Sequence, residues 1–297
     1  MQKSSSLLIL VGCIFLCSAL GIGLGLVITH FSELTPLTEL SDRAFPDQWF
    51  LRMFLNGVSH VSTFLLPVIL YWRYFERRSL ADFSWKKLNS PSVLWIAVII
   101  VVFLIPVNQQ IIEWNQSLKL PSAFAQIENW MRKTEQEKSL ITQKLLQIES
   151  FSELLVALMV FGVIGPIGEE VLFRGVLQRK LTEWHVNPVT SIWATALLFS
   201  IIHFQFYGFF PRLFLGALFG YFFYWSGNLW VAIGAHVANN SIFVITAYAH
   251  YNWPSIHKSI STISESTISI LLSISVSIYL LRLFRRRNFL MYQSIRN

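Results

Sequence analysis

The sequence has few charged residues and almost no cysteine. Only 13% of its 297 residues are Asp, Glu, Lys or Arg, whereas soluble domains carry about 25%. Because 54% of the residues are hydrophobic, we predict a membrane protein with several spans and exclude a secreted globular domain. The two cysteines, Cys13 and Cys17, both lie in the first apolar run, so the sequence implies no disulfide framework.

The net charge of +7 does not indicate nucleic-acid binding, because the basic residues cluster at the ends of apolar runs. Such clusters orient membrane proteins, since Lys and Arg favour the cytoplasmic side. They follow the second, fourth and eighth apolar runs, and alternating topology places these three ends on one side. We therefore predict a multi-pass protein of the cell membrane, surrounded by the lipid bilayer, with both termini in the cytoplasm.

Apolar runs of spanning length predict an all-α, polytopic transmembrane helix bundle of about eight spans in a single domain, residues 1–297. The predicted spans are residues 7–29, 53–72, 91–107, about 153–180, 189–207, 213–225, 229–249 and 267–283. Residues 108–150 differ, because they carry mixed charges. Apolar residues recur at helical spacing over residues 139–151, which predicts a short amphipathic helix before the fourth span. That helix either lies on the membrane surface or is a plain connector.

Two adjacent carboxylates, Glu169 and Glu170, stand at the end of an apolar run, residues 154–167. A charge in bilayer hydrocarbon costs at least a few kcal/mol, so ionisable groups there usually face a cavity and serve a function. Glu170 and Arg174 are four residues apart in the order that favours a helical ion pair. Glu169 lies about 100° around the helix and is expected to face other groups. A juxtamembrane salt bridge without chemistry is the alternative interpretation.

Two later spans each bring polar side chains into apolar surroundings. His203 follows Phe199 by four residues, and Asn240 follows His236 by four, so each pair shares a helix face. Each histidine taken alone fits a hydrogen bond between helices, as does His60 in the second span. Polar groups from three spans must nevertheless find partners within the membrane, and we predict that they meet in one pocket.

The residue types in this pocket suggest hydrolysis. A carboxylate beside a histidine can take a proton from water and later return it to a leaving group. Imidazole and carboxamide donors can stabilise an oxyanion, typically by a few kcal/mol each. No serine or cysteine lies in a recognised nucleophile motif, and no His-Glu-x-x-His segment occurs. Two histidines and one glutamate could still bind zinc with an open position, so that alternative stays open.

These segments resemble the three motifs of the CPBP family of intramembrane proteases, which includes the Rce1-type CaaX prenyl endopeptidase and the bacterial Abi proteins. The motifs are Glu-Glu-x-x-x-Arg, Phe-x-x-x-His and His-x-x-x-Asn. They are matched in this order by Glu169, Glu170 and Arg174, by Phe199 and His203, and by His236 and Asn240. The resemblance covers about residues 150–250, which would form the catalytic core.

The resemblance implies a metal-independent endopeptidase of the glutamate type, without a cofactor, acting on a membrane protein or a lipid-modified peptide. A bacteriocin-immunity or scaffold protein of the same family without proteolytic activity is the alternative function, and a zinc-dependent membrane protease is a further one. By similarity, Glu169 would be the base that activates water, and His203 would assist it. His236 and Asn240 would form the oxyanion site. Glu170, Arg174 and Phe199 would be the supporting residues.

Overall fold

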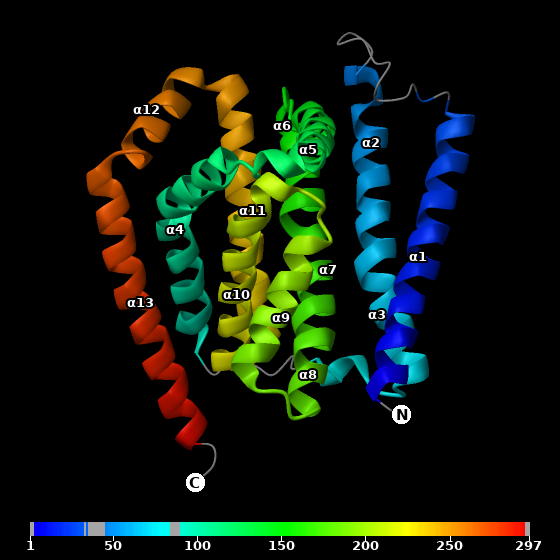
Figure 1. Cartoon of the computed structure of the whole chain (residues 1–297), viewed down its shortest axis with the longest axis vertical. Coiled ribbons are helices and arrows are strands. Elements are labelled where there is room, and N and C mark those ends of the chain that lie inside the picture. The colour runs from blue at the N-terminus through cyan, green and yellow to red at the C-terminus, as the bar shows by residue number, and fades with distance from the viewer. Residues whose placement is uncertain (1–2, 33, 35–44, 84–89, 295–297) are drawn as a thin grey trace.

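The computed structural model describes residues 3–32, 34, 45–83 and 90–294, and its helices form an upright bundle (Figure 1). The described residues include no strand, and 89% of them are helical. This confirms the predicted all-α, polytopic helix bundle. The start of α1 (Lys3–Phe31) and the end of α13 (Thr267–Ser294) lie at the same end of the bundle (Figure 1).

Among the described residues, seven helical stretches are long and apolar enough to cross a membrane. They are Ser5–Phe31, Gln48–Phe75, Pro91–Ser117, Phe151–Glu183, Phe206–Ser226, Leu229–Asn252 and Thr267–Arg287. An eighth apolar helix, α9 (Pro188–Ile201), is too short to count with them and falls where the fifth span was predicted. The eight predicted runs therefore correspond to seven candidate spans and one short helix.

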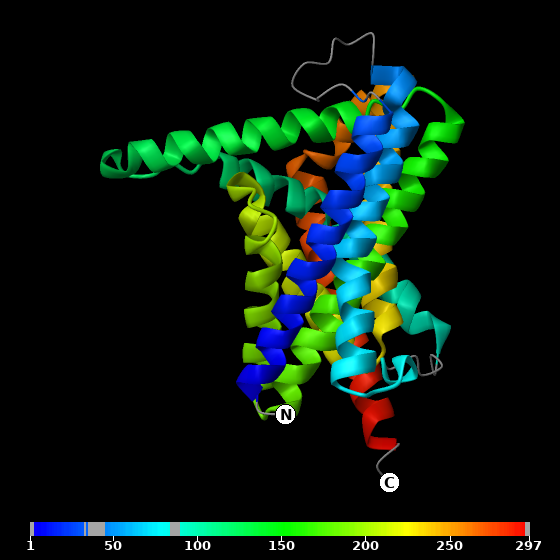
Figure 2. The same cartoon turned by 90° about the vertical axis from the view of Figure 1, so that its right-hand side faces the viewer.

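The amphipathic helix before the fourth span has different bounds from those predicted. It is α5 (Ala125–Leu145), whereas the spacing predicted a helix over residues 139–151. The helix does not continue to residue 151, because Ser150 caps a new helix, α6 (Phe151–Ala157). The Glu153 N–H of this helix donates to the Ser150 hydroxyl at 3.2 Å. The Ser150 N–H donates in return to the Glu153 carboxylate at 3.1 Å, which completes a capping box. Helix α5 projects sideways from the bundle (Figure 2).

The fourth span is one continuous helix, and its length sets the depth of the acidic pair. It consists of α6, η5 (Leu158–Ile164), α7 (Gly165–Glu170), η6 (Val171–Gln178) and α8 (Arg179–Glu183). Glu169 precedes its last residue by 14 positions, and His203 follows the first residue of α9 by 15. At 1.5 Å per residue, both side chains lie roughly 20 Å from the turn that joins the two helices. Equal lengths on the two sides of this turn thus bring Glu169 and His203 to one level.

Small residues allow the helices around the site to approach closely. Lipid tails are as apolar as leucine, so helices in a membrane associate through tight packing more than through the hydrophobic effect. Gly216 of α10 (Phe209–Ser226) faces α9 so closely that an added Cβ would lie 3.3 Å from the Cβ of Ala196. One turn further, a Cβ on Gly220 would lie 2.9 Å from Ile192. A larger residue at either glycine would therefore separate α10 from α9.

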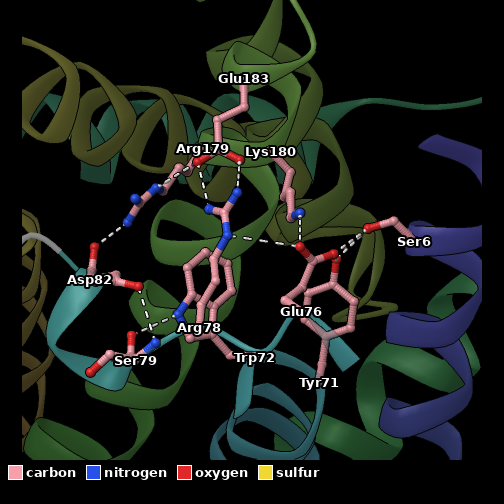
Figure 3. Close-up of polar contacts among 10 residues, drawn as sticks. All are labelled: Ser6, Tyr71, Trp72, Glu76, Arg78, Ser79, Asp82, Arg179, Lys180 and Glu183. Atoms are coloured by element: carbon pink, nitrogen blue, oxygen red, sulfur yellow. Dashed lines mark hydrogen bonds and ion pairs between the residues drawn. The ribbon is translucent and has the colours of Figure 1, made fainter. Parts of the chain in front are cut away.

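A cluster of polar residues joins three helices near the start of α1 (Figure 3). The Glu76 carboxylate accepts hydrogen bonds from Tyr71 at 2.7 Å and from Ser6 of α1 at 2.9 Å. Its second oxygen lies 2.5 Å from the ammonium group of Lys180 in α8. The side chains of Glu76 and Lys180 are only 10% and 6% exposed, so water screens their ion pair poorly. The cluster ties α1 to the end of the fourth span.

Replacing Lys180 with Met should lower the free energy of unfolding by about 1–3 kcal/mol at pH 7, because Glu76 would keep a buried charge with one partner fewer. Burial alone would raise the pKa of the Glu76 carboxyl, but hydrogen bonds from Lys180, Tyr71 and Ser6 lower it below its usual value. The pair therefore stabilises the fold at neutral pH, and this contribution is lost as the pH falls below the usual carboxylate range, about 4.

Thermal unfolding in detergent at pH 7 and at low pH measures this effect. The deficit of the Lys180→Met variant should shrink at the lower pH, and a deficit of equal size at both pH values would contradict the prediction. Lys258→Met, which removes an exposed lysine from α12 (Pro254–Ser264), is the matched control and should leave Tm unchanged.

Candidate active site

Glu170 and Arg174 form a fully buried ion pair at the centre of the site. The Glu170 Oε1 atom accepts from Arg174 Nη1 at 2.9 Å, and their side chains are 0% and 1% exposed. The other end of the guanidinium donates through Nη2 to the carbonyl oxygen of Gly216 at 2.6 Å. The same Glu170 oxygen lies 2.9 Å from Nδ1 of His236. The pair expected from the four-residue spacing is therefore present, and it also connects the fourth span to α10 and to α11 (Leu229–Asn252).

Glu169 points away from this pair and towards two imidazoles. Its Oε2 atom is 3.7 Å from His236 Nε2, and its Oε1 atom is 4.0 Å from His203 Nε2. These separations exceed the range of a direct N–H···O hydrogen bond, about 2.7–3.2 Å. The side chains of Glu169 and His236 are only 8% and 6% exposed, whereas that of His203 is 24% exposed.

The contact of the Nδ1 atom fixes the orientation of each histidine ring. His203 Nδ1 lies 2.6 Å from the carbonyl oxygen of Phe199, which can only accept, so Nδ1 is the donor. His236 Nδ1 faces the Glu170 carboxylate in the same way. In the neutral form, each ring therefore presents a lone pair at Nε2 to Glu169. Phe199 packs edge-on against both rings, with centroids 4.9 and 6.0 Å away.

The site residues line a small cavity, which we call the motif cavity. Its volume is about 200 Å³. Asn240 lines it one turn beyond His236, and its side-chain amide donates to the carbonyl oxygen of Phe161 at 3.2 Å. Of the seven residues predicted from the motifs, Glu169, Phe199, His203, His236 and Asn240 line the cavity, while Glu170 and Arg174 lie behind it.

Two further polar residues of the motif cavity, Arg212 and Asn239, were missed by sequence reasoning. Arg212 donates to the carbonyl oxygen of Gln205 at 3.1 Å and also to its side-chain oxygen. We predicted the sixth span to begin at residue 213, which left Arg212 outside it. Arg212 could have been found in the sequence as a charge next to an apolar run, which is the signal that indicated Glu169.

His60 lies apart from the motif cavity. It ends α2 (Phe45–His60), stacks on Phe64 at 6.0 Å, and lies against Gly165, where an added Cβ would be 3.5 Å from its Cε1 atom. Its buried Nδ1 atom has no hydrogen-bond partner among the described residues. The hydrogen bond between helices that we expected for this residue is therefore not found at that nitrogen.

The donor set at the cavity agrees only partly with a zinc site. Zinc-binding histidines usually donate their second N–H to a carbonyl or a carboxylate, as His203 and His236 do. Two donors at zinc-ligand distance in a tetrahedral site would lie about 3.4 Å apart, closer than the 3.7 and 4.0 Å to Glu169. Within the described part of the chain, no group of three candidate ligands that could hold a metal ion is found.

Comparison with known proteins finds a family model that covers the segment with the three motifs. The sequence model of the family described as "Type II CAAX prenyl endopeptidase Rce1-like" matches residues 151–242, which contain all three motifs. The chain is also 24% identical over 155 residues to "Uncharacterized protein YpbD" of Bacillus subtilis (strain 168), covering 51% of this chain and 67% of that protein. No solved structure matches the chain.

Fold and sequence together define the class as a multi-pass membrane protein with a buried polar site. The match to residues 151–242 confirms the resemblance recognised from the three motifs, and at the family level it supports a CAAX-protease-like membrane peptidase.

Proposed function

We propose that the protein is an intramembrane endopeptidase that hydrolyses a peptide bond with a water molecule activated by Glu169. The observation that carries this proposal is the convergence of one carboxylate and two imidazole Nε2 atoms in one cavity, at 3.7 and 4.0 Å. The family match supports the peptidase class. Among the described residues, neither a serine nor a cysteine lines the cavity, whereas a carboxylate and an imidazole are suited to proton transfer.

The proposed reaction starts with a water molecule between Glu169 and His203. Glu169 takes one proton as the water oxygen attacks the carbonyl carbon, and His203 Nε2 accepts the other O–H and orients the water. The C–O bond forms, and the carbonyl oxygen becomes an oxyanion. Glu169 then gives its proton to the amide nitrogen as the C–N bond breaks, which releases a carboxylic acid and an amine.

The oxyanion would be stabilised by Asn240 and His236. The Asn240 amide uses one N–H on Phe161 and has a second for the oxyanion. His236 can donate from Nε2 only when it also holds a proton there, and the Glu170 carboxylate at its Nδ1 stabilises the resulting positive charge. Arg174 in turn fixes Glu170, so the buried ion pair orients the donors from behind.

The test is cleavage of a library of internally quenched peptides by the purified protein in liposomes. Cleavage by the wild type that disappears in Glu169→Gln, with helicity and Tm unchanged, supports the proposal. Undiminished cleavage by that variant would reject it.

A zinc-dependent protease is the second candidate, favoured by the carbonyl and carboxylate contacts at Nδ1 of the two histidines. We expect the purified protein to hold no stoichiometric zinc and to keep its activity with a chelator such as phenanthroline. Elemental analysis would decide: one zinc per chain that is lost in His203→Ala would replace the metal-free mechanism. His185→Ala, at an exposed position, is the matched control.

A further inference from the structure

A second and larger cavity, which we call the polar cavity, lies beside the motif cavity on the side of α5. Its volume is about 630 Å³, within the range of ligand-binding pockets. Nine of its twelve lining residues carry polar side chains, although the chain is 54% hydrophobic. They include Glu135, Ser139 and Thr142 of α5, Gln205 from the turn after α9, and Thr246 and His250 of α11.

Helix α11 leads from one cavity to the other. Asn239 and Asn240 line the motif cavity, while Phe243 and Thr246 line the polar cavity. Residues three or four apart share a helix face, and one turn advances 5.4 Å. The same face of α11 therefore passes from the proposed reaction centre into the polar cavity within about one turn.

A hydrogen-bonded pair provides a second connection. Gln205 lines the polar cavity, and its oxygens accept from Arg212, which lines the motif cavity. Because the two side chains are bonded to each other and face different cavities, the two spaces meet at this pair.

Helix α5 is fixed to the turn that carries His203. The Lys138 ammonium group donates to the carbonyl oxygen of His203 at 2.7 Å, and the Tyr207 N–H donates to the Glu135 carboxylate at 3.4 Å. The Arg132 guanidinium also lies over the ring of Tyr207, 4.7 Å from its centroid. Helix α5 is therefore more than a connector. It forms a wall of the polar cavity and supports the turn that carries His203.

We propose that the polar cavity is a vestibule through which an extended, hydrophilic segment of the substrate polypeptide reaches the motif cavity; this rests on the proposed function. Inside a membrane, the backbone of an extended peptide must find hydrogen-bond partners. The hydroxyl and amide groups of Ser139, Thr142, Gln143 and Thr246 offer both donors and acceptors. A lipid tail would leave these groups without partners, so the polar walls favour a peptide.

The position of the vestibule sets the side of entry. Helix α5 lies at the end of the bundle opposite to the start of α1 and the end of α13 (Figures 1 and 2). With the predicted cytoplasmic termini, the substrate segment enters from the outer side of the membrane. The substrate class is therefore a polar loop or tail of a polypeptide on that side.

Narrowing the vestibule tests the route. Thr246→Trp places a bulky side chain at an exposed wall position, and Ile245→Trp is the matched control on the neighbouring face of α11, outside the cavity lining. With the internally quenched peptide library in liposomes, Thr246→Trp should lower kcat/KM at least tenfold, mainly through KM, and Ile245→Trp should not. Unchanged cleavage by Thr246→Trp, together with loss in Glu169→Gln, overturns the vestibule and leaves the proposed function standing.

The side of entry has a test that needs no catalysis. In a chain with Cys13 and Cys17 replaced by alanine, Thr246→Cys is treated with a membrane-impermeant thiol reagent in sealed vesicles of known orientation. We expect modification from the side opposite to a tag on the N-terminus. Modification only from the tagged side, or from neither side, overturns the vestibule even if no peptide is cleaved. Cleavage that survives Glu169→Gln would instead overturn the proposed function alone.

Discussion

Glu169→Gln should lower kcat for peptide cleavage by roughly 10³-fold, within the 10²–10⁴-fold that a positioned general base contributes. Glutamine has nearly the same shape, but its amide cannot take a proton from water at neutral pH. The Glu169 carboxylate lies 3.7 and 4.0 Å from the two imidazoles, whereas the neighbouring Glu170 carboxylate is bound by Arg174 and His236 Nδ1. Because the change affects proton transfer more than substrate contact, KM should change little.

Steady-state kinetics on a cleaved library peptide measure this effect, with Glu265→Gln, at an exposed position, as the matched control. A Glu169→Gln variant with one-tenth or more of the wild-type kcat would show that another group activates water. A variant that loses cleavage but keeps a cellular protection phenotype would favour the immunity or scaffold role.

Arg174→Met should lower the free energy of unfolding by about 3–5 kcal/mol, the usual cost of removing one partner from a buried ion pair. Glu170 is 0% exposed, and without the guanidinium its charge would have only the His236 ring as a polar partner in this region. The carbonyl oxygen of Gly216 would also lose its donor. Methionine keeps much of the volume, so the loss reports on charge more than on a cavity.

The matched variant is the double change Glu170→Gln with Arg174→Met, which removes both charges. It should recover part of the lost stability, and the double-mutant cycle should give a coupling energy above 1 kcal/mol. Arg285→Met, which removes an exposed arginine of α13, should leave Tm unchanged. A loss in the double variant equal to the sum of the two single losses would show that the two charges do not depend on each other.

The sequence alone predicted the features that depend on local spacing. The lengths of the apolar runs indicated the helix bundle, because a span must be long enough to cross the bilayer. Four-residue spacing indicated the Glu170–Arg174 pair, because residues i and i+4 share a face of one helix. The motif formed by Phe199 and His203 was recognised for the same reason, since both residues lie in one helix or at its end.

Only the tertiary structure decided which side chains from different helices meet. The level of Glu169 relative to His203 depends on where the fourth span ends and where α9 begins, and the periodicity of the sequence does not show these positions. Arg212 lines the motif cavity near the start of α10, and Gly216, one turn further, packs closely on α9. Spacing along the sequence does not show such a contact between two helices. Spacing along one helix fixes direction, whereas distance between helices follows from their packing and from the length of the turns that join them.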